Sequence, residues 1–263
     1  YFERLAYEML EDCAGCNTRY VEISFSPSDH VQRGLDYYDM IDAINRGIAK
    51  ASRDFSVQCN IRIDLVRNFG PENGMQVLDW IEQKPDNIVS IDIGGSEDKY
   101  PAKPFAEVYA RAKEMGLHRA AHAGEAAGSE SVWQAVKHLE VERIGHGVTA
   151  RNDQQLLQVL QEKGIAIEAC PVSNVRTRVV ESIGEHPIRE YFDKGLLVTV
   201  NSDDPSFFHT NMDNEYIQLG KHLGFCMEDL FQLSLNAIEA SFLSTKSKDK
   251  MRDAFHREVG RII

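Results

Sequence analysis

Hydrophobic and polar positions alternate along this chain in two repeating patterns. Short apolar runs end abruptly at glycine, proline or acidic residues, and between them apolar side chains recur three or four positions apart. The runs are typical of buried strands and the wider spacing of amphipathic helices. The chain is expected to begin in a helix at 2–13. The expected strands are 20–25, 57–66, 88–93, 118–122, 142–146, 165–170 and 196–202, and the helices between and after them are 36–52, 71–83, 103–115, 130–139, 153–163, 186–194 and most of 212–258.

Strands that alternate with helices predict a parallel α/β sheet. Seven strand–helix units are expected, whereas a closed (β/α)8 TIM barrel has eight strands. We therefore predict an α/β fold of the TIM-barrel type whose first strand is absent from this chain. A doubly wound open sheet is less well supported, because no G-x-G-x-x-G follows the first expected strand. No linker or shift in composition divides the chain, so residues 1–263 are expected to form a single domain.

The net charge indicates which kind of ligand the protein binds, and the cysteine content indicates the compartment in which it is found. The formal net charge of −12 would repel phosphates, so a small ligand is expected rather than a nucleic acid. No apolar run approaches the length of a membrane span, and no signal peptide is visible. The five cysteines are few and odd in number, which favours a reducing, cytoplasmic location. The C-x-x-C pair, Cys13 and Cys16, is interpreted as structural.

Candidate chemistry is found where three apolar runs end. Residues 118–122 end in His122, and Glu125 follows three positions later. A His-x-x-Glu by itself is most often an ordinary polar pair. However, residues 142–147 contain His146, and residues 196–205 lead into Asp203 and Asp204. Because the carboxyl ends of barrel strands meet on one face, we expect these side chains to form one site.

These residue types suit a site in which a zinc ion promotes hydrolysis of a substrate. Zinc takes histidine nitrogen and carboxylate oxygen and keeps a position for water, so His122 and Asp203 are a plausible partial ligand set. Zinc also lowers the pKa of its water to about 7. His146 is expected to hold that water or take its proton, and Glu125 to deliver a proton to the substrate. The side chain of Asp204 would point in another direction from that of Asp203, and would either accept a hydrogen bond from the substrate or support a metal ligand from behind.

The turn Gly94-Gly95 exposes backbone amides that a flat ligand could approach closely. Alternatives remain open for two positions. His146 could be a satisfied histidine at a strand end, and Asp203-Asp204-Pro205 could serve only as a helix N-cap. The other histidines have no comparable setting and are interpreted as surface or structural residues: His30, His118, His138, His186, His209, His222 and His256.

Four motifs together resemble the adenosine deaminase family of metal-dependent hydrolases. They are His-Ala-Gly-Glu at 122–125, Arg-Ile-Gly-His-Gly at 143–147, Cys-Pro-Val-Ser-Asn at 170–174 and Asn-Ser-Asp-Asp-Pro at 201–205. Their order and spacing match the family along nearly the whole chain. The resemblance implies a (β/α)8 barrel, one zinc ion, and hydrolytic loss of ammonia from C6 of an adenine ring.

The resemblance also implies a role for each motif residue. It makes His122 and Asp203 zinc ligands. Glu125 would protonate purine N1, and His146 would orient and deprotonate the attacking water. Asp204 would pair with purine N7, and the backbone amide of Gly95 would meet N3.

The chain departs from the family pattern at one point. The family has an H-x-H pair at the end of its first strand that supplies two further zinc ligands, and no H-x-H occurs in this sequence. Two further histidine ligands are therefore expected upstream of Tyr1, and these 263 residues alone are not expected to be an efficient enzyme. The substrate stays open among adenosine, a modified adenosine, adenine and aminodeoxyfutalosine. A catalytically silent barrel used as a binding module is the alternative, and the oligomeric state is not predicted.

Overall fold

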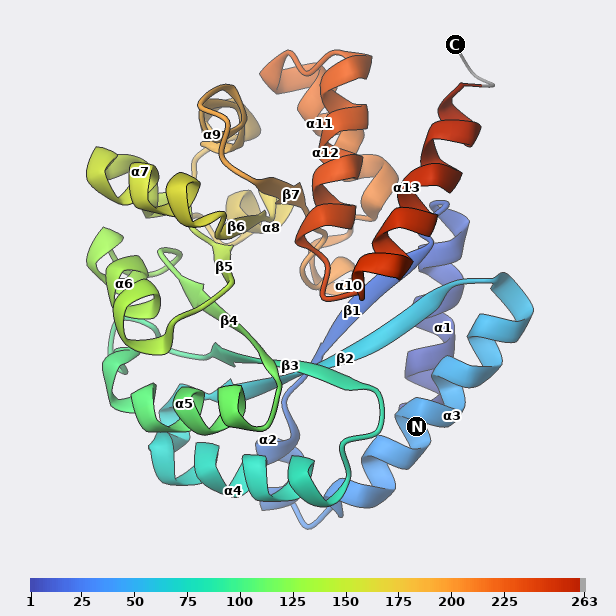
Figure 1. Ribbon diagram of the computed structural model, residues 1–263, viewed down its shortest axis with the longest axis vertical. Helices are drawn as coiled ribbons and strands as arrows, with labels where there is room; N and C mark the ends of the chain where they lie inside the picture. The colour runs from blue at the N-terminus through green and yellow to red at the C-terminus, as the bar shows by residue number, and fades with distance from the viewer. Residues whose placement is uncertain (261–263) are drawn as a thin grey trace.

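The computed structural model describes residues 1–260. Its seven strands form one parallel sheet in the order β1 to β7, each paired with the next along the chain. The sheet curls around an interior, with helices packed outside it (Figure 1). The strands are β1 (Tyr20–Phe25), β2 (Gln58–Val66), β3 (Ile88–Gly94), β4 (His118–Ala123), β5 (Arg143–His146), β6 (Ala166–Ala169) and β7 (Val198–Val200). The prediction of a barrel-type sheet without its first strand is confirmed.

The helices that cover this sheet follow the predicted apolar spacing. The long ones are α1 (Phe2–Gly15), α3 (Tyr37–Phe55), α4 (Gly70–Gln83), α5 (Ala106–Glu114), α7 (Gln154–Lys163), α11 (Met212–Leu223), α12 (Met227–Ala240) and α13 (Thr245–Val259). The short ones are α2 (Pro27–Gln32), α6 (Ser129–Gln134), α8 (Pro171–Arg176), α9 (Ile188–Asp193) and α10 (Pro205–Phe208). No helix within residues 1–260 is long and apolar enough to cross a membrane.

Alternation along the strands separates the hydrophobic core from the barrel interior. In β2 the side chains of Cys59, Ile61, Ile63 and Leu65 are buried, while the residues between them are partly exposed. Successive side chains of a strand point to opposite faces. The apolar face packs under the surrounding helices, and the opposite face, which includes Arg62, carries polar side chains into the interior.

Several boundaries differ from those expected. The helix expected at 130–139 is α6 followed by a π-helical turn, Ala135–Leu139. The last strand is shorter than 196–202 because the chain leaves the sheet after Val200. The short helices α2 and α8 were not predicted. Each begins at a proline two positions after the last residue of a strand and is too short to display helical periodicity.

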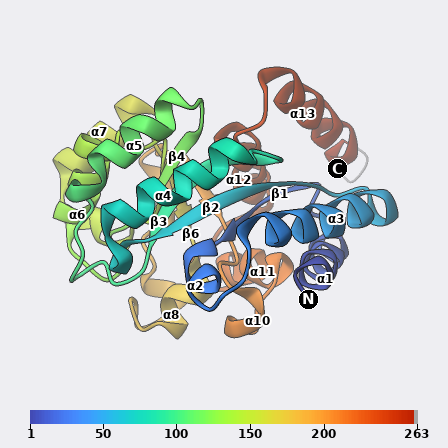
Figure 2. The ribbon, with the colours of Figure 1, turned by 90° about the horizontal axis from the view of Figure 1, so that it is seen from below.

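The connections that follow β1, β6 and β7 contain the short helices α2, α8 and α10. These helices lie on the same side of the molecule, beyond the carboxyl ends of the strands (Figure 2). In parallel β/α folds this face gathers the functional side chains. The functional side chains are therefore expected at these strand ends.

Candidate functional site

His146 lies at the centre of the candidate site, as the last residue of β5. Its backbone has φ +64°, which is uncommon for a residue other than glycine, and its side chain is 3% exposed. Nε2 lies 3.5 Å from Oε2 of Glu125 and 4.0 Å from Oδ2 of Asp203. The fold therefore brings together residues from the ends of β4, β5 and β7.

Burial and charge set the protonation of His146. Burial lowers its pKa, and the positive charge of nearby His122 lowers it further, against the opposite effect of Glu125 and Asp203. The two histidine rings are 5.1 Å apart, centroid to centroid. The net result is a pKa below the ordinary histidine value, so the neutral ring of His146 is favoured.

The paired aspartates after β7 have different surroundings. Oδ2 of Asp203 accepts a hydrogen bond of 2.6 Å from Oγ of Ser173. Asp204 occupies the N-cap position of α10, but its side chain makes no capping hydrogen bond. Helix capping by the side chain therefore does not explain why an aspartate occupies position 204. Burial and the charge of Asp203 raise the pKa of Asp204.

Gly95 follows β3 directly, with φ +97°. A Cβ atom at this position would lie 2.4 Å from Oδ1 of Asn68, so no larger residue fits without movement of the backbone or of Asn68. The turn is held by the N–H of Ser96, which donates to the same Asn68 oxygen at 2.9 Å. The exposed backbone at Gly95 is thus a fixed feature of the rim.

His122, on β4, faces the buried carboxylate of Asp92 and the partly buried carboxylate of Asp64, both of which the sequence interpretation missed. Its Nδ1 lies 3.1 Å from Oδ2 of Asp92 on β3, and Asp64 on β2 completes the group. Burial lowers the pKa of His122, but the charges of Asp92 and Asp64 outweigh burial and raise it to about 10. Burial raises the pKa of Asp92, yet His122 and Arg62 hold it well below its usual range.

Two clusters offer metal-binding atoms within 4.8 Å of one another: Asp64, Asp92 and His122, and His146, Cys170 and Asp203. In the first, Oδ1 of Asp64, Oδ2 of Asp92 and Nδ1 of His122 are buried without an aligned hydrogen-bond partner among the described residues. In the second, burial raises the pKa of the Cys170 thiol, as do the carboxylates of Asp203 and Glu168, so the neutral thiol is a poor ligand. Histidine nitrogen and carboxylate oxygen are donor types that suit zinc, and the two proposed ligands, His122 and Asp203, lie one in each cluster.

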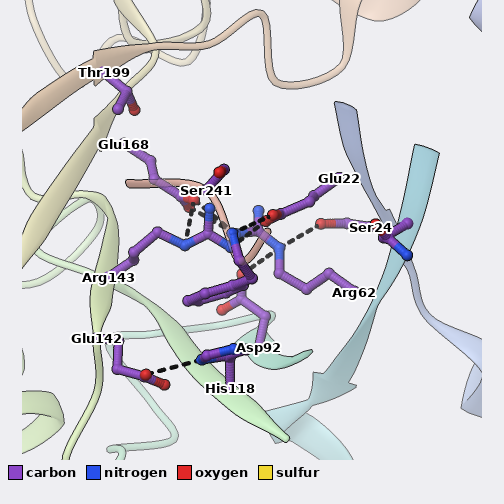
Figure 3. Close-up of polar contacts among 12 residues, drawn as sticks. Glu22, Ser24, Arg62, Asp92, His118, Glu142, Arg143, Glu168, Thr199 and Ser241 are labelled. Carbon is purple, nitrogen blue, oxygen red and sulfur yellow. Dashed lines mark hydrogen bonds and ion pairs between the residues drawn. The ribbon is translucent and has the colours of Figure 1, made fainter. Parts of the chain in front are cut away.

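A network of ion pairs lies inside the barrel beside this site (Figure 3). Nη1 of Arg62 donates to both oxygens of Glu168, at 2.9 and 2.7 Å, and Nε lies 3.4 Å from Oδ2 of Asp92. Arg143 pairs with Glu22 and, at 3.3 Å, with Glu168. Charged residues at alternate positions of apolar strands were the sequence signal for this network. Their partners lie on other strands and were not predicted.

Glu97 was also missed, and it holds the loop that carries Glu125. Its carboxylate is buried and accepts four backbone N–H bonds: from Gly124 at 2.5 Å, Glu125 at 3.1 Å, Ala126 at 2.7 Å and Ala127 at 3.0 Å. Successive N–H groups that converge on one anion form a nest. Nothing in the local sequence marks Glu97, since its partners are 27–30 positions away.

A parallel β/α sheet whose carboxyl ends present histidine, glutamate and aspartate defines a barrel of the hydrolase class. The chain belongs to the adenosine deaminase family, whose family model, described as adenosine deaminase, matches residues 1–258. The adenosine deaminase of Edwardsiella ictaluri is 37% identical over 252 residues, which are 95% of this chain and 76% of that protein. The prediction of a hydrolase acting on C–N bonds is thereby confirmed.

Solved structures agree with this family. The adenine deaminase of Arthrobacter aurescens superimposes with a TM-score of 0.95 at 32% identity, covering 98% of this chain and 79% of that one. An amidohydrolase from Burkholderia ambifaria, solved with bound zinc, gives a TM-score of 0.93 at 30% identity and covers 98% and 72% of the two chains. These likenesses extend the fold match over nearly all of the chain.

Proposed function

We propose that this protein hydrolyses the C6 amine of adenosine, or of a closely related adenine compound, and releases ammonia. The observation that carries the proposal is the convergence of the Glu125 and Asp203 carboxylates on Nε2 of His146 at the carboxyl end of the sheet. The names of the family and of its relatives supply the substrate class. The net charge of −12 supports a small purine rather than a nucleic acid as the partner.

Each side chain has a distinct task in this proposal. Glu125 gives a proton to N1 of the purine, which makes C6 electrophilic, and His146 orients the water that adds there. The C6–N bond then breaks, the amine leaves as ammonia, and the ring becomes a 6-oxopurine. Burial and the charge of Asp203 raise the pKa of Asp204, and its protonated carboxyl donates a hydrogen bond to N7, while the backbone N–H of Gly95 donates to N3.

His122 and Asp203 are the residues proposed to hold zinc. When bound, zinc would supply Lewis acidity and lower the pKa of a water to about 7. Asp92, next to Nδ1 of His122, would fix the orientation of that ring, as carboxylates commonly do for metal-binding histidines. The two further histidine ligands expected upstream of Tyr1 stay a prediction. The five cysteines are free, which supports the predicted cytoplasmic location.

The test is ammonia release by the purified protein after its zinc content has been measured by elemental mass spectrometry. Adenosine, adenine and aminodeoxyfutalosine are supplied separately. We expect release from adenosine, a loss of about 100-fold or more in kcat for Glu125→Gln, and little change for Glu130→Gln, a control on the surface of α6. Zinc-loaded protein that releases ammonia from none of the three compounds would favour the binding-module alternative.

A further inference from the structure

The ring of His146 has a second polar contact, on the side opposite the carboxylates. Nδ1 of His146 lies 3.1 Å from Nδ2 of Asn174, in α8. Oδ1 of the same amide lies 3.0 Å from Nε2 of His186. All three side chains are buried, with at most 3% exposed. Asn174 therefore bridges two histidine rings away from solvent.

A backbone group determines where the protons lie in this bridge. The N–H of Ile188 donates to Nδ1 of His186 at 3.2 Å. A backbone N–H is always a donor, so this ring nitrogen accepts, and neutral His186 carries its proton on Nε2. Burial lowers the pKa of His186 to about 3, which agrees with a neutral ring.

The proton on Nε2 of His186 then orients the amide of Asn174. It donates to Oδ1, which leaves the NH₂ group of Asn174 to donate to Nδ1 of His146. The reversed amide would require both nitrogens of His186 to accept, and a neutral imidazole has only one accepting nitrogen. Nδ1 of His146 is consequently an acceptor, and the neutral ring has its proton on Nε2.

The carboxylates on the other side of His146 agree with this assignment. Nε2 faces Oε2 of Glu125 and Oδ2 of Asp203, and an N–H group at Nε2 is the donor that carboxyl oxygens accept. A proton on Nε2 therefore satisfies the contacts on both sides of the ring. A proton on Nδ1 would face the NH₂ group of Asn174 and leave a lone pair directed at two carboxylates.

We infer that His186 and Asn174 are positioning residues that fix His146 as its Nε2–H tautomer. His146 then directs the attacking water by donating a hydrogen bond to the water oxygen, and does not take the water's proton. This inference rests on the proposed function and refines it. Glu125, ionised after its proton has passed to N1, is the closer of the two carboxylates to Nε2 and receives the proton from water. The leaving amine later takes that proton and departs as ammonia, and the proton of the hydroxyl now on C6 passes to Glu125 as the 6-oxo group forms.

The tautomer can be observed without any turnover. Nitrogen-15 NMR of protein labelled at histidine distinguishes protonated from unprotonated ring nitrogens, and a His146→Gln variant assigns the signal. We expect Nε2 of His146 to carry the proton and Nδ1 to be unprotonated. A protonated Nδ1 in the wild-type protein would overturn the inference.

Asn174→Asp tests the consequence for catalysis. A carboxylate still accepts from Nε2–H of His186, but it also accepts from Nδ1 of His146 and should draw the proton there. We expect the NMR signal to move, kcat to fall about 10–100-fold, and KM to change little. Asn236→Asp in α12, where the amide donates to the carbonyl of Val198 and accepts from Gln232, controls for general destabilisation.

The outcomes separate this inference from the proposed function. Unchanged kcat in Asn174→Asp, with the proton moved to Nδ1, would overturn the donor role of His146. A wild-type protein that deaminates no adenine compound would contradict the proposed function, while the NMR measurement would still decide the tautomer.

Discussion

Nδ1 of His122 lies 3.1 Å from Oδ2 of Asp92, and Asp92 is completely buried between neighbouring strands. The other oxygen of Asp92 accepts the backbone N–H groups of Ile93 and His122, at 2.7 and 3.0 Å. One carboxylate thus touches both the backbone and the ring of the same histidine. This double contact fixes the direction in which the remaining nitrogen, Nε2, is presented.

Asp92→Asn should therefore weaken metal binding. The amide cannot supply the negative charge that holds the ring of His122, and loss of such a partner typically lowers metal affinity about 10–100-fold. Competition with a chromophoric chelator measures the zinc affinity. Asp98→Asn is the matched control because Asp98 is exposed on the loop after the same strand. Equal zinc affinities for the two variants would contradict the role given to Asp92.

Glu97→Gln should loosen the loop that carries Glu125. An amide offers one accepting oxygen and directs its NH₂ group at N–H donors that the carboxylate now binds. We expect faster hydrogen exchange at the amides of residues 124–127 and a kcat reduced by up to about 100-fold, as for a misplaced catalytic group. Glu107→Gln, on the exposed surface of α5, should change neither measurement. Unaltered exchange in Glu97→Gln would show that the nest does not hold the loop.

Arg62→Met should destabilise the fold strongly. It removes one of the two partners of Glu168 and of Asp92, whose side chains are 9% and 0% exposed, so that Glu168 keeps only Arg143 and Asp92 keeps only His122 in the barrel interior. Removing one member of a buried pair typically lowers the free energy of unfolding by about 3–5 kcal/mol. Urea denaturation of the wild type and of Arg62→Met measures this difference in the free energy of unfolding.

Arg46→Met supplies the comparison for Arg62. Arg46 pairs with Glu3 on the surface, where both side chains are about half exposed or more. Such a pair contributes less than about 1 kcal/mol. Similar losses in the two variants would mean that the interior network is not desolvated as described.

His186 should make stability depend on acid pH. Its pKa falls from 6.5 in the unfolded chain to about 3 in the fold, so the folded state favours the neutral ring. That contribution is complete above pH 6.5 and is lost as the pH falls from 6.5 through 3, with a slope of up to about 1.4 kcal/mol per pH unit. The stability advantage of the wild type over His186→Gln should shrink across this window. A difference in stability between the wild type and His186→Gln that stays constant across this window would refute the prediction.

The sequence by itself determined the parallel α/β architecture and most of the strand ends. Apolar runs and helical spacing are local patterns, so they can be recognised in the sequence without knowledge of the fold. Because the carboxyl ends of parallel strands share one face, His122, Glu125, His146 and Asp203 could be assigned to a common site from their positions alone. The fold confirms this sheet and places Glu125 and Asp203 beside His146.

Only the tertiary structure decided which polar side chains meet. Arg62 and Glu168 are 106 positions apart, and their contact depends on how far the sheet curls and on the register of its strands. The nest around Glu97 and the bridge from His186 to His146 likewise join segments that are far apart in the sequence. The local sequence of neither segment predicts the contact. Periodicity specifies the face on which a residue lies. The partner on that face is set by long-range packing, which fixes hydrogen-bond directions and thereby the tautomer of His146.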